Sequence, residues 1–186
     1  MEVMTMEEYG ASLLKDPLNE SKGRNRRNTP EKLYNCGGFA LSTYDWLCPY
    51  AEKPEQDSWT ERSRILYVED RLGFEPLEDI TDEVVDLDAN YLLRTYPFLK
   101  QVNLSDCSKD DTVIAYRIFI DASDEYVEDT DFHFRVRHNG FWFEKMGTDD
   151  ITICITDVEN PWGDIEDEDI VYNSKVVYFK TTRGFI

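Results

Sequence analysis

Cys36 and His133 are the two residues whose types and chain order suggest chemistry. Cys36 lies in the segment Tyr-Asn-Cys-Gly-Gly-Phe-Ala, and His133 lies much later in Asp-Phe-His-Phe-Arg. A cysteine at the start of a helix has a lowered thiol pKa, because the helix end carries partial positive charge and free N–H groups. A histidine beside it can take the thiol proton and later give it to a leaving group. The pair therefore predicts nucleophilic thiol catalysis, which needs no cofactor.

A hairpin that follows His133 offers a third catalytic group. Asn139-Gly140 is a strong signal for a two-residue turn, and it lies between two segments that alternate apolar and polar residues. Counting outward from this turn pairs Arg135 with Glu144 and places His133 diagonally to Glu144 on the same face. The Glu144 carboxylate could therefore hold the imidazole in its working tautomer.

The assignment of this third group stays open between two carboxylates. Arg135 faces Glu144 in the predicted register and competes with His133 for its carboxylate. Asp131 is the rival, because it lies two residues before His133 on the same face of the strand. Glu144 is preferred over Asp131.

Three residues near the pair are predicted to bind substrate. The backbone N–H groups of Cys36 and Gly37, together with Asn35, would form an oxyanion hole. The two glycines after the cysteine would allow close approach of a substrate to the backbone. Trp142 would contribute to the substrate surface, or else pack as a cross-strand aromatic over Arg137.

Two islands of the sequence, YNCGGFAL and DFHFRVRHNGFWFEKMG, resemble the papain-like NlpC/P60 and CHAP superfamily. More closely, they resemble small uncharacterised phage and bacterial proteins with an Asn-Cys-x-x-(aromatic)-Ala segment and a later His-(aromatic)-x-Arg…Trp-x-x-Lys-x-Gly segment. Cys36 and His133 match the Cys and His of that superfamily, and Glu144 falls about where its third, polar residue lies. The resemblance implies a papain-like α+β fold and thiol chemistry on an amide bond, as in a peptidase, amidase, deamidase or acyl transferase.

Helices are predicted in the first half of the chain. Residues 36–47 show helical spacing of apolar residues and end at Cys48-Pro49. A capping box at Ser58-x-x-Glu61 predicts a second helix that ends at Gly73. The segment 77–107 is ambiguous, because it joins an acidic stretch to an apolar cluster that is broken at Pro97.

Strands are predicted in the second half of the chain. The candidate strands have alternating or β-rich composition and cover residues 112–121, 131–138, 141–146, 150–156 and 176–181. The order predicts an α+β fold with N-terminal helices packed on an antiparallel sheet of about four to five strands. The polar segment 1–33 is interpreted as an N-terminal arm, followed by one domain over residues 34–186.

The charge of the chain narrows the choice of partner. The 186 residues include 39 acidic and 20 basic side chains, a net charge of −19. Such a chain is not expected to bind nucleic-acid phosphates or anionic lipid, so the expected substrate is a basic or neutral peptide or protein. Acidic residues gather in the segments 78–88, 121–131 and 149–170, which are interpreted as solvated faces.

These acidic segments also support a hypothesis from another class. They could dock onto a basic partner or imitate DNA, as in a phage inhibitor or a virion component. The chain would then be a non-enzymatic interaction protein, and Cys36 and His133 would be core residues or relics.

The remaining residues with chemical potential predict little further function. Cys48, Cys107 and Cys154 show no C-x-x-C spacing and are expected to be free thiols. No metal site is expected, because the histidines are few and the acidic segments lack EF-hand spacing. Trp162 is expected to anchor in the core. The chain shows no signal peptide or membrane span, so a cytoplasmic location is expected, in the host cell or virion if the protein is phage-encoded.

Overall fold

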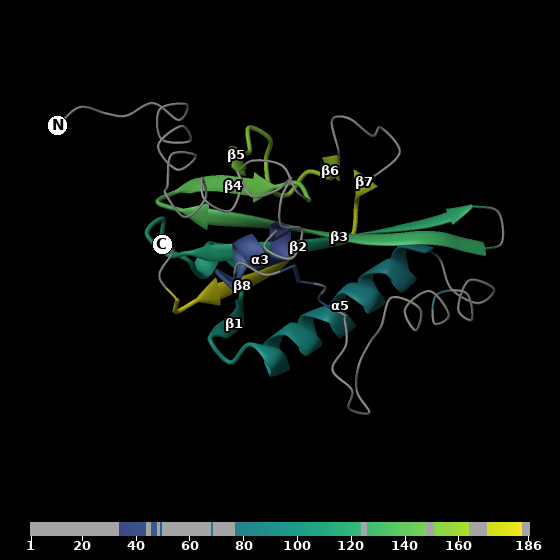
Figure 1. Ribbon diagram of the computed structural model, residues 1–186, viewed down its shortest axis with the longest axis horizontal. Helices are drawn as coiled ribbons and strands as arrows, with labels where there is room; N and C mark the ends of the chain where they lie inside the picture. Colours follow the sequence, from purple (N-terminus) through teal and green to yellow (C-terminus); the bar gives the residue numbers. More distant parts are fainter. Residues whose placement is uncertain are drawn as a thin grey trace, which may run out of the picture.

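The computed structural model describes residues 34–43, 46–47, 49, 68, 77–123, 126–147, 151–163 and 171–183. The described helices are α3 (Cys36–Ala40), α5 (Leu77–Thr95) and the short 3-10 helix η3 (Leu104–Asp106). The described strands are β1 (Leu99–Val102), β2 (Val113–Ser123), β3 (Tyr126–His138), β4 (Phe141–Lys145), β5 (Ile151–Ile153), β6 (Trp162–Gly163), β7 (Val171–Tyr172) and β8 (Val177–Thr181), as labelled in Figure 1.

Six of these strands form one antiparallel sheet in the order β1-β8-β2-β3-β4-β5, and β6 pairs with β7 in a separate hairpin. The predicted α+β class and the antiparallel sheet are confirmed. The predicted count of four to five strands is too low, because β1 joins the edge of the sheet. Residues 99–102 lie in the ambiguous segment, and their pairing with β8, far along the chain, makes them a strand.

Strands β2 and β3 form a ribbon that is longer than either neighbour. Strand β8 pairs only with Val113–Tyr116 of β2, and β4 pairs only with Arg135–His138 of β3. The rest of the β2–β3 ribbon therefore projects beyond its flanking strands (Figure 1). His133 lies just past the last residue that β4 pairs, at the point where an edge of β3 becomes available to α3.

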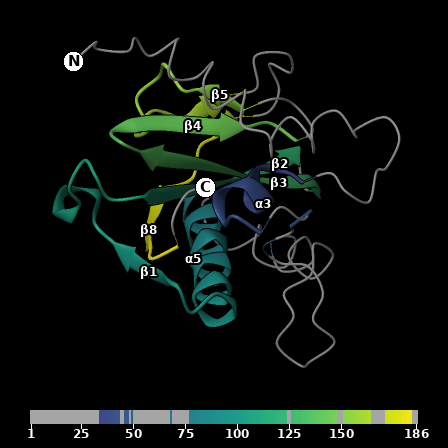
Figure 2. The same ribbon diagram turned by 60° about the vertical axis from the view of Figure 1, so that its left-hand side comes forward.

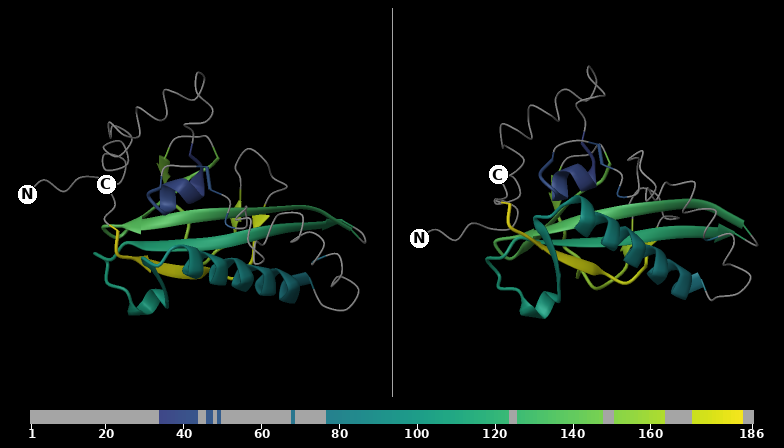
Figure 3. Two further views of the ribbon diagram at one scale, coloured as in Figure 1. Left: turned by 60° about the horizontal axis from the view of Figure 1, so that its bottom comes forward. Right: turned by 90° about the horizontal axis from the view of Figure 1, so that it is seen from below.

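The two faces of the sheet carry two apolar cores. The helix-side core lies under α3 and α5 and includes Cys36, Val84, Tyr116, Phe134 and Phe179. The hairpin-side core lies on the opposite face and includes Val113, Ala115, Val158, Trp162, Tyr172 and Tyr178. Helix α3 packs on β3 and β4, whereas α5 runs along β1, β2 and β8 (Figure 2 and Figure 3). Successive residues of β3 thus face alternate cores.

Helix α3 is shorter than predicted. It ends at Ala40, and Ser42 adopts a positive φ of 51°, so the prediction of a helix over residues 36–47 is wrong in its second half. The Asn35 side chain bonds both the N–H and the C=O group of Leu47. In a continuous helix Leu47 would lie too far from Asn35 for these bonds, so the chain turns back after α3. The predicted second helix is described only at Val68, which is helical and buried. The arm 1–33, Cys48 and the capping box lie outside the described residues.

The acidic stretch of the ambiguous segment forms helix α5. Its apolar side chains Ile80, Val84, Val85, Ala89 and Leu92 are buried at helical spacing against the sheet. The acidic side chains Asp79, Glu83 and Asp86 are exposed, which matches the interpretation of a solvated face. Asp88 differs, because it is buried and accepts a hydrogen bond of 2.5 Å from the Tyr116 hydroxyl. Among the described residues, no helix combines the length and apolar character needed to cross a membrane.

Candidate thiol site

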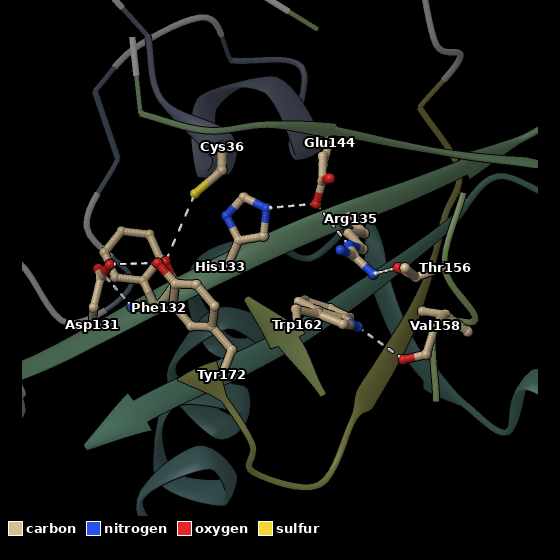
Figure 4. Close-up of polar contacts among 10 residues, drawn as sticks. All are labelled: Cys36, Asp131, Phe132, His133, Arg135, Glu144, Thr156, Val158, Trp162 and Tyr172. Carbon is tan, nitrogen blue, oxygen red and sulfur yellow. Dashed lines mark hydrogen bonds and ion pairs between the residues drawn. The ribbon is translucent and has the colours of Figure 1, made fainter. Parts of the chain in front are cut away.

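The β3–β4 hairpin brings the imidazole and the carboxylate together. Asn139 and Gly140 form its turn with φ values of 50° and 85°, the left-handed region that a two-residue turn of this kind requires. Arg135 pairs with Glu144, so the predicted register is confirmed. In this register Nε2 of His133 is 3.3 Å from Oε2 of Glu144 (Figure 4).

Arg135 shares the Glu144 carboxylate, as the register also predicted. Its Nε donates to the same Oε2 at 2.8 Å, and its Nη1 donates to Oγ1 of Thr156 at 3.3 Å. Burial acts to raise the pKa of Glu144, but the hydrogen bonds and charges of His133 and Arg135 outweigh burial and lower that pKa to about 2. Since an ionised carboxylate can only accept, Nε2 of His133 carries the proton in this contact, and Nδ1 is the acceptor of the neutral ring.

Aromatic rings fix the orientation of the imidazole. His133 is 2% exposed and packs on Tyr172, with ring centroids 5.3 Å apart, and edge-on to Trp162 at 5.9 Å. Trp162 in turn contacts the guanidinium groups of Arg117 and Arg135, which lie 5.2 and 4.6 Å from its ring centroid. Trp162 is 1% exposed, which confirms the prediction that it anchors in the core.

Cys36 approaches the same part of β3 from helix α3. Its thiol donates a weak hydrogen bond of 3.9 Å to the carbonyl oxygen of Phe132, the residue before His133. Figure 4 shows the His133 ring between Cys36 and Glu144, with Nε2 directed to Glu144 and the Nδ1 edge directed to the side of the Cys36 sulfur. The structure thus brings His133 and Glu144 into contact, and it places the Cys36 thiol against the main chain of Phe132, the residue before His133.

The electrostatics of Cys36 differ from the sequence prediction. Burial raises the pKa of its thiol to about 12, and the charge of Asp131 acts in the same direction. The N–H groups of Phe134 and Gly37 and the charge of Lys145 act to lower the pKa, but they do not offset burial. The prediction of a lowered thiol pKa is therefore wrong, because Cys36 is only 4% exposed and α3 has only one turn. The resting thiol keeps its proton at neutral pH and needs a base to lose it.

Asn35 is engaged in holding the start of α3 to Leu47. Its side-chain oxygen accepts from the N–H groups of Gly38 and Leu47 at 3.1 Å each, and its Nδ2 donates to the Leu47 carbonyl at 2.6 Å. The side chain predicted to bind an oxyanion is thus the N-cap of the helix. An oxyanion role stays a prediction for the main-chain N–H groups of Cys36 and Gly37, which have no acceptor within a helix.

Gly37 is needed for packing, while its predicted role in the approach of substrate stays a prediction. A Cβ atom at this position would lie 2.6 Å from Cδ2 of Leu47 and 3.4 Å from the Phe134 ring. The glycine therefore lets α3 come close to the Leu47 side chain and to β3.

The role of Asn35 gives a stability prediction. We expect Asn35→Ala to lower the free energy of unfolding by about 2–3 kcal/mol, because it removes the N-cap and leaves the buried carbonyl of Leu47 without its partner. Urea denaturation measures the change. The control is Asn103→Ala, since among the described residues the exposed Asn103 amide donates only to Asp106, and it should cost less than about 0.5 kcal/mol. Equal effects of the two substitutions would contradict this account of Asn35.

Two further predicted residues lie apart from the imidazole–carboxylate contact. Trp142 is half-buried and packs against Tyr178, with Arg137 5.9 Å from its ring centroid, which matches the alternative of a cross-strand aromatic. Asp131 accepts from the Tyr172 hydroxyl at 2.6 Å and from the N–H of Phe132 at 2.7 Å. The carboxylate on Nε2 of His133 is therefore that of Glu144 and not that of Asp131.

Sequence reasoning missed two residues of this site. Tyr172 follows a long acidic segment, and nothing in its sequence context indicates that its ring packs on His133. Lys145 is 4% exposed, and its Nζ lies 5.0 Å from the ring centroid of Tyr34, just before α3. Strand alternation does place Lys145 on the face opposite Glu144, so an inward-facing lysine near the helices could have been found from the register.

The two other cysteines that the structure describes match their predicted state. Cys107 and Cys154 are free thiols, as is Cys36, and burial raises the pKa of Cys154. In the part of the chain that the structure describes, no group of His, Cys, Asp and Glu side chains is arranged to hold a metal ion. Comparison of the chain with protein-family models, with curated proteins and with solved structures found no match in any of the three.

Proposed function

We propose that the chain is a papain-like cysteine hydrolase or acyl transferase that acts on an amide bond, as a peptidase, amidase or deamidase. The observation that carries this proposal is the contact of His133 with Glu144 together with the bond of the Cys36 thiol to Phe132, the residue before His133 (Figure 4). Nε2 of His133 is 3.3 Å from the Glu144 carboxylate, and the opposite edge of the ring is directed to the side of Cys36. This is the order of nucleophile, base and orienting carboxylate in thiol catalysis.

The raised pKa of Cys36 decides how such a reaction begins. The sulfur attacks the amide carbonyl carbon while its proton moves to Nδ1 of His133, and Glu144 stabilises the imidazolium that forms. The main-chain N–H groups of Cys36 and Gly37 face the oxyanion of the tetrahedral intermediate. When the C–N bond breaks, His133 returns the proton to the leaving amine, and the acyl group remains on Cys36 as a thioester.

The second half of the reaction releases the acyl group. His133 removes a proton from a water molecule, which attacks the thioester carbon, and the Cys36 sulfur leaves with the proton that His133 returns. The product is a carboxylic acid. An amine in place of water gives a new amide, which is the acyl-transferase outcome.

Two features support the type of enzyme and the class of substrate that we propose. A short helix with the cysteine beside an antiparallel sheet with the histidine is the arrangement that the papain-like resemblance implies. The net charge of −19 favours a basic or neutral peptide or protein as substrate and disfavours nucleic acid. No step in the mechanism requires a cofactor.

A second candidate function is that of a non-enzymatic acidic protein that binds a basic partner. The specific observation in its favour is that Cys36 is 4% exposed and fully protonated at neutral pH. The exposed carboxylates of α5, Asp79, Glu83 and Asp86, would then be candidates for the contact surface. In that case partner binding should weaken with added salt and should not change in Cys36→Ala.

The test compares Cys36→Ala with Cys107→Ala. Cys107 is the control, because it is also a free thiol and its Sγ bonds the Asn103 carbonyl, apart from His133 and Glu144. Fluorogenic peptide amides with basic or neutral residues before the amide serve as substrates, and intact mass reports the thioester. We expect turnover and acyl-enzyme in the wild type and in Cys107→Ala, and neither in Cys36→Ala. Unchanged turnover in Cys36→Ala would refute the proposed function.

A further inference from the structure

Asp131 lies beside the thiol on the edge of β3. One oxygen of its carboxylate accepts from the N–H of Phe132 at 2.7 Å, and the carbonyl oxygen of Phe132 accepts from the Cys36 thiol at 3.9 Å. The N–H and C=O groups of one strand residue point to the same edge of the strand. The Asp131 carboxylate and the Cys36 sulfur therefore flank the same residue on the same edge, as Figure 4 shows.

Tyr172 fixes the second oxygen of this carboxylate. Its hydroxyl donates to Oδ2 of Asp131 at 2.6 Å, while its ring packs on His133 at a centroid distance of 5.3 Å. Each carboxylate oxygen thus has one donor and keeps the capacity to accept another hydrogen bond. Asp131 is half-buried, whereas Cys36 and His133 are almost fully buried, so Asp131 is the more solvent-facing member of this group.

The charge of Asp131 acts against the chemistry of its neighbour. The ion pairs among the described residues do not include Asp131. A carboxylate beside a nucleophilic sulfur disfavours both the thiolate and the oxyanion that follows it. The described charged groups around Cys36 are Asp131 and His133 on β3 and Glu144 and Lys145 on β4. Of these, Glu144 is paired with Arg135, and Lys145 donates to the Gly147 carbonyl at 3.2 Å.

We propose that Asp131 is a specificity-determining residue that binds a cationic group of the substrate, an ammonium or guanidinium group next to the scissile amide. This inference rests on the proposed function of Cys36 and His133 and names the substrate class of the same site. A bound cation offsets the carboxylate charge beside the sulfur. Proton transfer from Cys36 to His133 is then easier with a cationic substrate than with a neutral or anionic substrate of the same size.

The experiment measures charge selectivity at Cys36 directly. Three methanethiosulfonate reagents of similar size carry an aminoethyl, a propyl or a sulfonatoethyl group on their thiol sulfur. The Cys36 sulfur attacks that thiol sulfur, its S–SO2 bond breaks, and the products are a mixed disulfide on Cys36 and methanesulfinate. Mass spectrometry of the Cys36 peptide gives each rate, which is divided by the rate of the same reagent with a small free thiol. In the wild type we expect the cationic reagent to react about tenfold or more faster than the anionic one.

The variants separate the local charge from the net charge. Asp131→Asn keeps the shape of the side chain and should reduce the cation-to-anion ratio by about tenfold. Asp110→Asn removes the same charge far from the site. Asp110 lies in an exposed turn before β2, and Asp131 pairs with Phe119 near the other end of that strand. This control should change the cation-to-anion ratio by less than about twofold. Tyr172→Phe keeps the carboxylate and the ring, so it should retain the preference for the cation.

The outcomes distinguish this inference from the function on which it rests. If Asp131→Asn keeps the wild-type ratio while Cys36 still reacts and amide turnover persists, the assignment of Asp131 is wrong and the proposed function stands. If none of the reagents modifies Cys36 in the wild type, the site is closed to substrates, and both proposals fail.

Discussion

Glu144→Gln is expected to lower the rate constant of amide turnover on the order of 10²–10⁴-fold. Nε2 of His133 lies 3.3 Å from this carboxylate, whose negative charge favours the imidazolium that forms when Cys36 loses its proton. Glutamine has the same shape and can still accept a hydrogen bond, but it has no charge, so it stabilises the imidazolium less. The loss should appear in kcat more than in KM, because it concerns the transition state rather than substrate binding. Glu83→Gln, at an exposed position of α5, is the matched control and should leave kcat unchanged.

The same substitution should change how stability depends on pH. The folded pKa of Glu144 is lowered from an ordinary value of 4.5 to about 2, and its side chain is 18% exposed. A carboxyl group whose folded pKa is depressed adds stability above its unfolded pKa, and that stability is lost as the pH falls toward the folded pKa. This contribution is about 3 kcal/mol and disappears between about pH 4.5 and pH 2. Urea denaturation across this range should show a smaller loss in Glu144→Gln than in the wild type; identical losses would contradict the ion-pair account.

Arg117→Met is expected to be among the most destabilising single substitutions in the described part of the chain. The Arg117 guanidinium is buried and donates to the carbonyl oxygens of Glu159 at 2.7 Å and Ser174 at 2.9 Å, with longer contacts to those of Val158 at 3.3 Å and Tyr172 at 3.5 Å. It therefore ties the segments around β6 and β7 to the sheet. Methionine fills much of the volume but satisfies none of these carbonyls, so the expected loss is about 3–5 kcal/mol.

Urea denaturation also measures this effect. Arg94→Met, at an exposed position in the last turn of α5, is the control and should change the free energy of unfolding by less than about 0.5 kcal/mol. A loss below about 1 kcal/mol in Arg117→Met would mean that the carbonyls find other donors. Because Trp162 and Tyr172 contact His133, Arg117→Met should also lower catalysis if it remains folded.

The imidazole–carboxylate contact could be predicted because it depends on local turn chemistry. An Asn139-Gly140 turn fixes the register of the residues that flank it, so Arg135 and Glu144 pair, and His133 lies diagonally to Glu144. The competition of Arg135 for the carboxylate follows from the same register. The strand before the turn was predictable because residues 131–138 alternate strictly, and the last strand was predictable from the apolar run at residues 176–179.

Features that depend on distant parts of the chain could not be predicted. Residues 99–102 become a strand only because β8 pairs with them. Helix α5 mixes buried apolar residues with so many acidic ones that its pattern was ambiguous until the sheet supplied a partner face. The thiol pKa of Cys36 depends on burial by tertiary packing, which outweighs the local effect of a one-turn helix. The contact of Tyr172 with Asp131 likewise requires the closed fold.

The central claim is that His133 acts as the base for Cys36, and the rate of Cys36 alkylation as a function of pH tests it most directly. Iodoacetamide is neutral, so its reaction with Cys36, followed by mass spectrometry in the wild type and in His133→Asn, reports deprotonation of the thiol. An unaided thiol with a pKa of about 12 should react at a rate that rises about tenfold per pH unit throughout the neutral range. The account predicts this steep rise in His133→Asn, and in the wild type a much faster reaction near neutral pH that levels off once the imidazole is neutral. Superimposable steep profiles for the two proteins would contradict it.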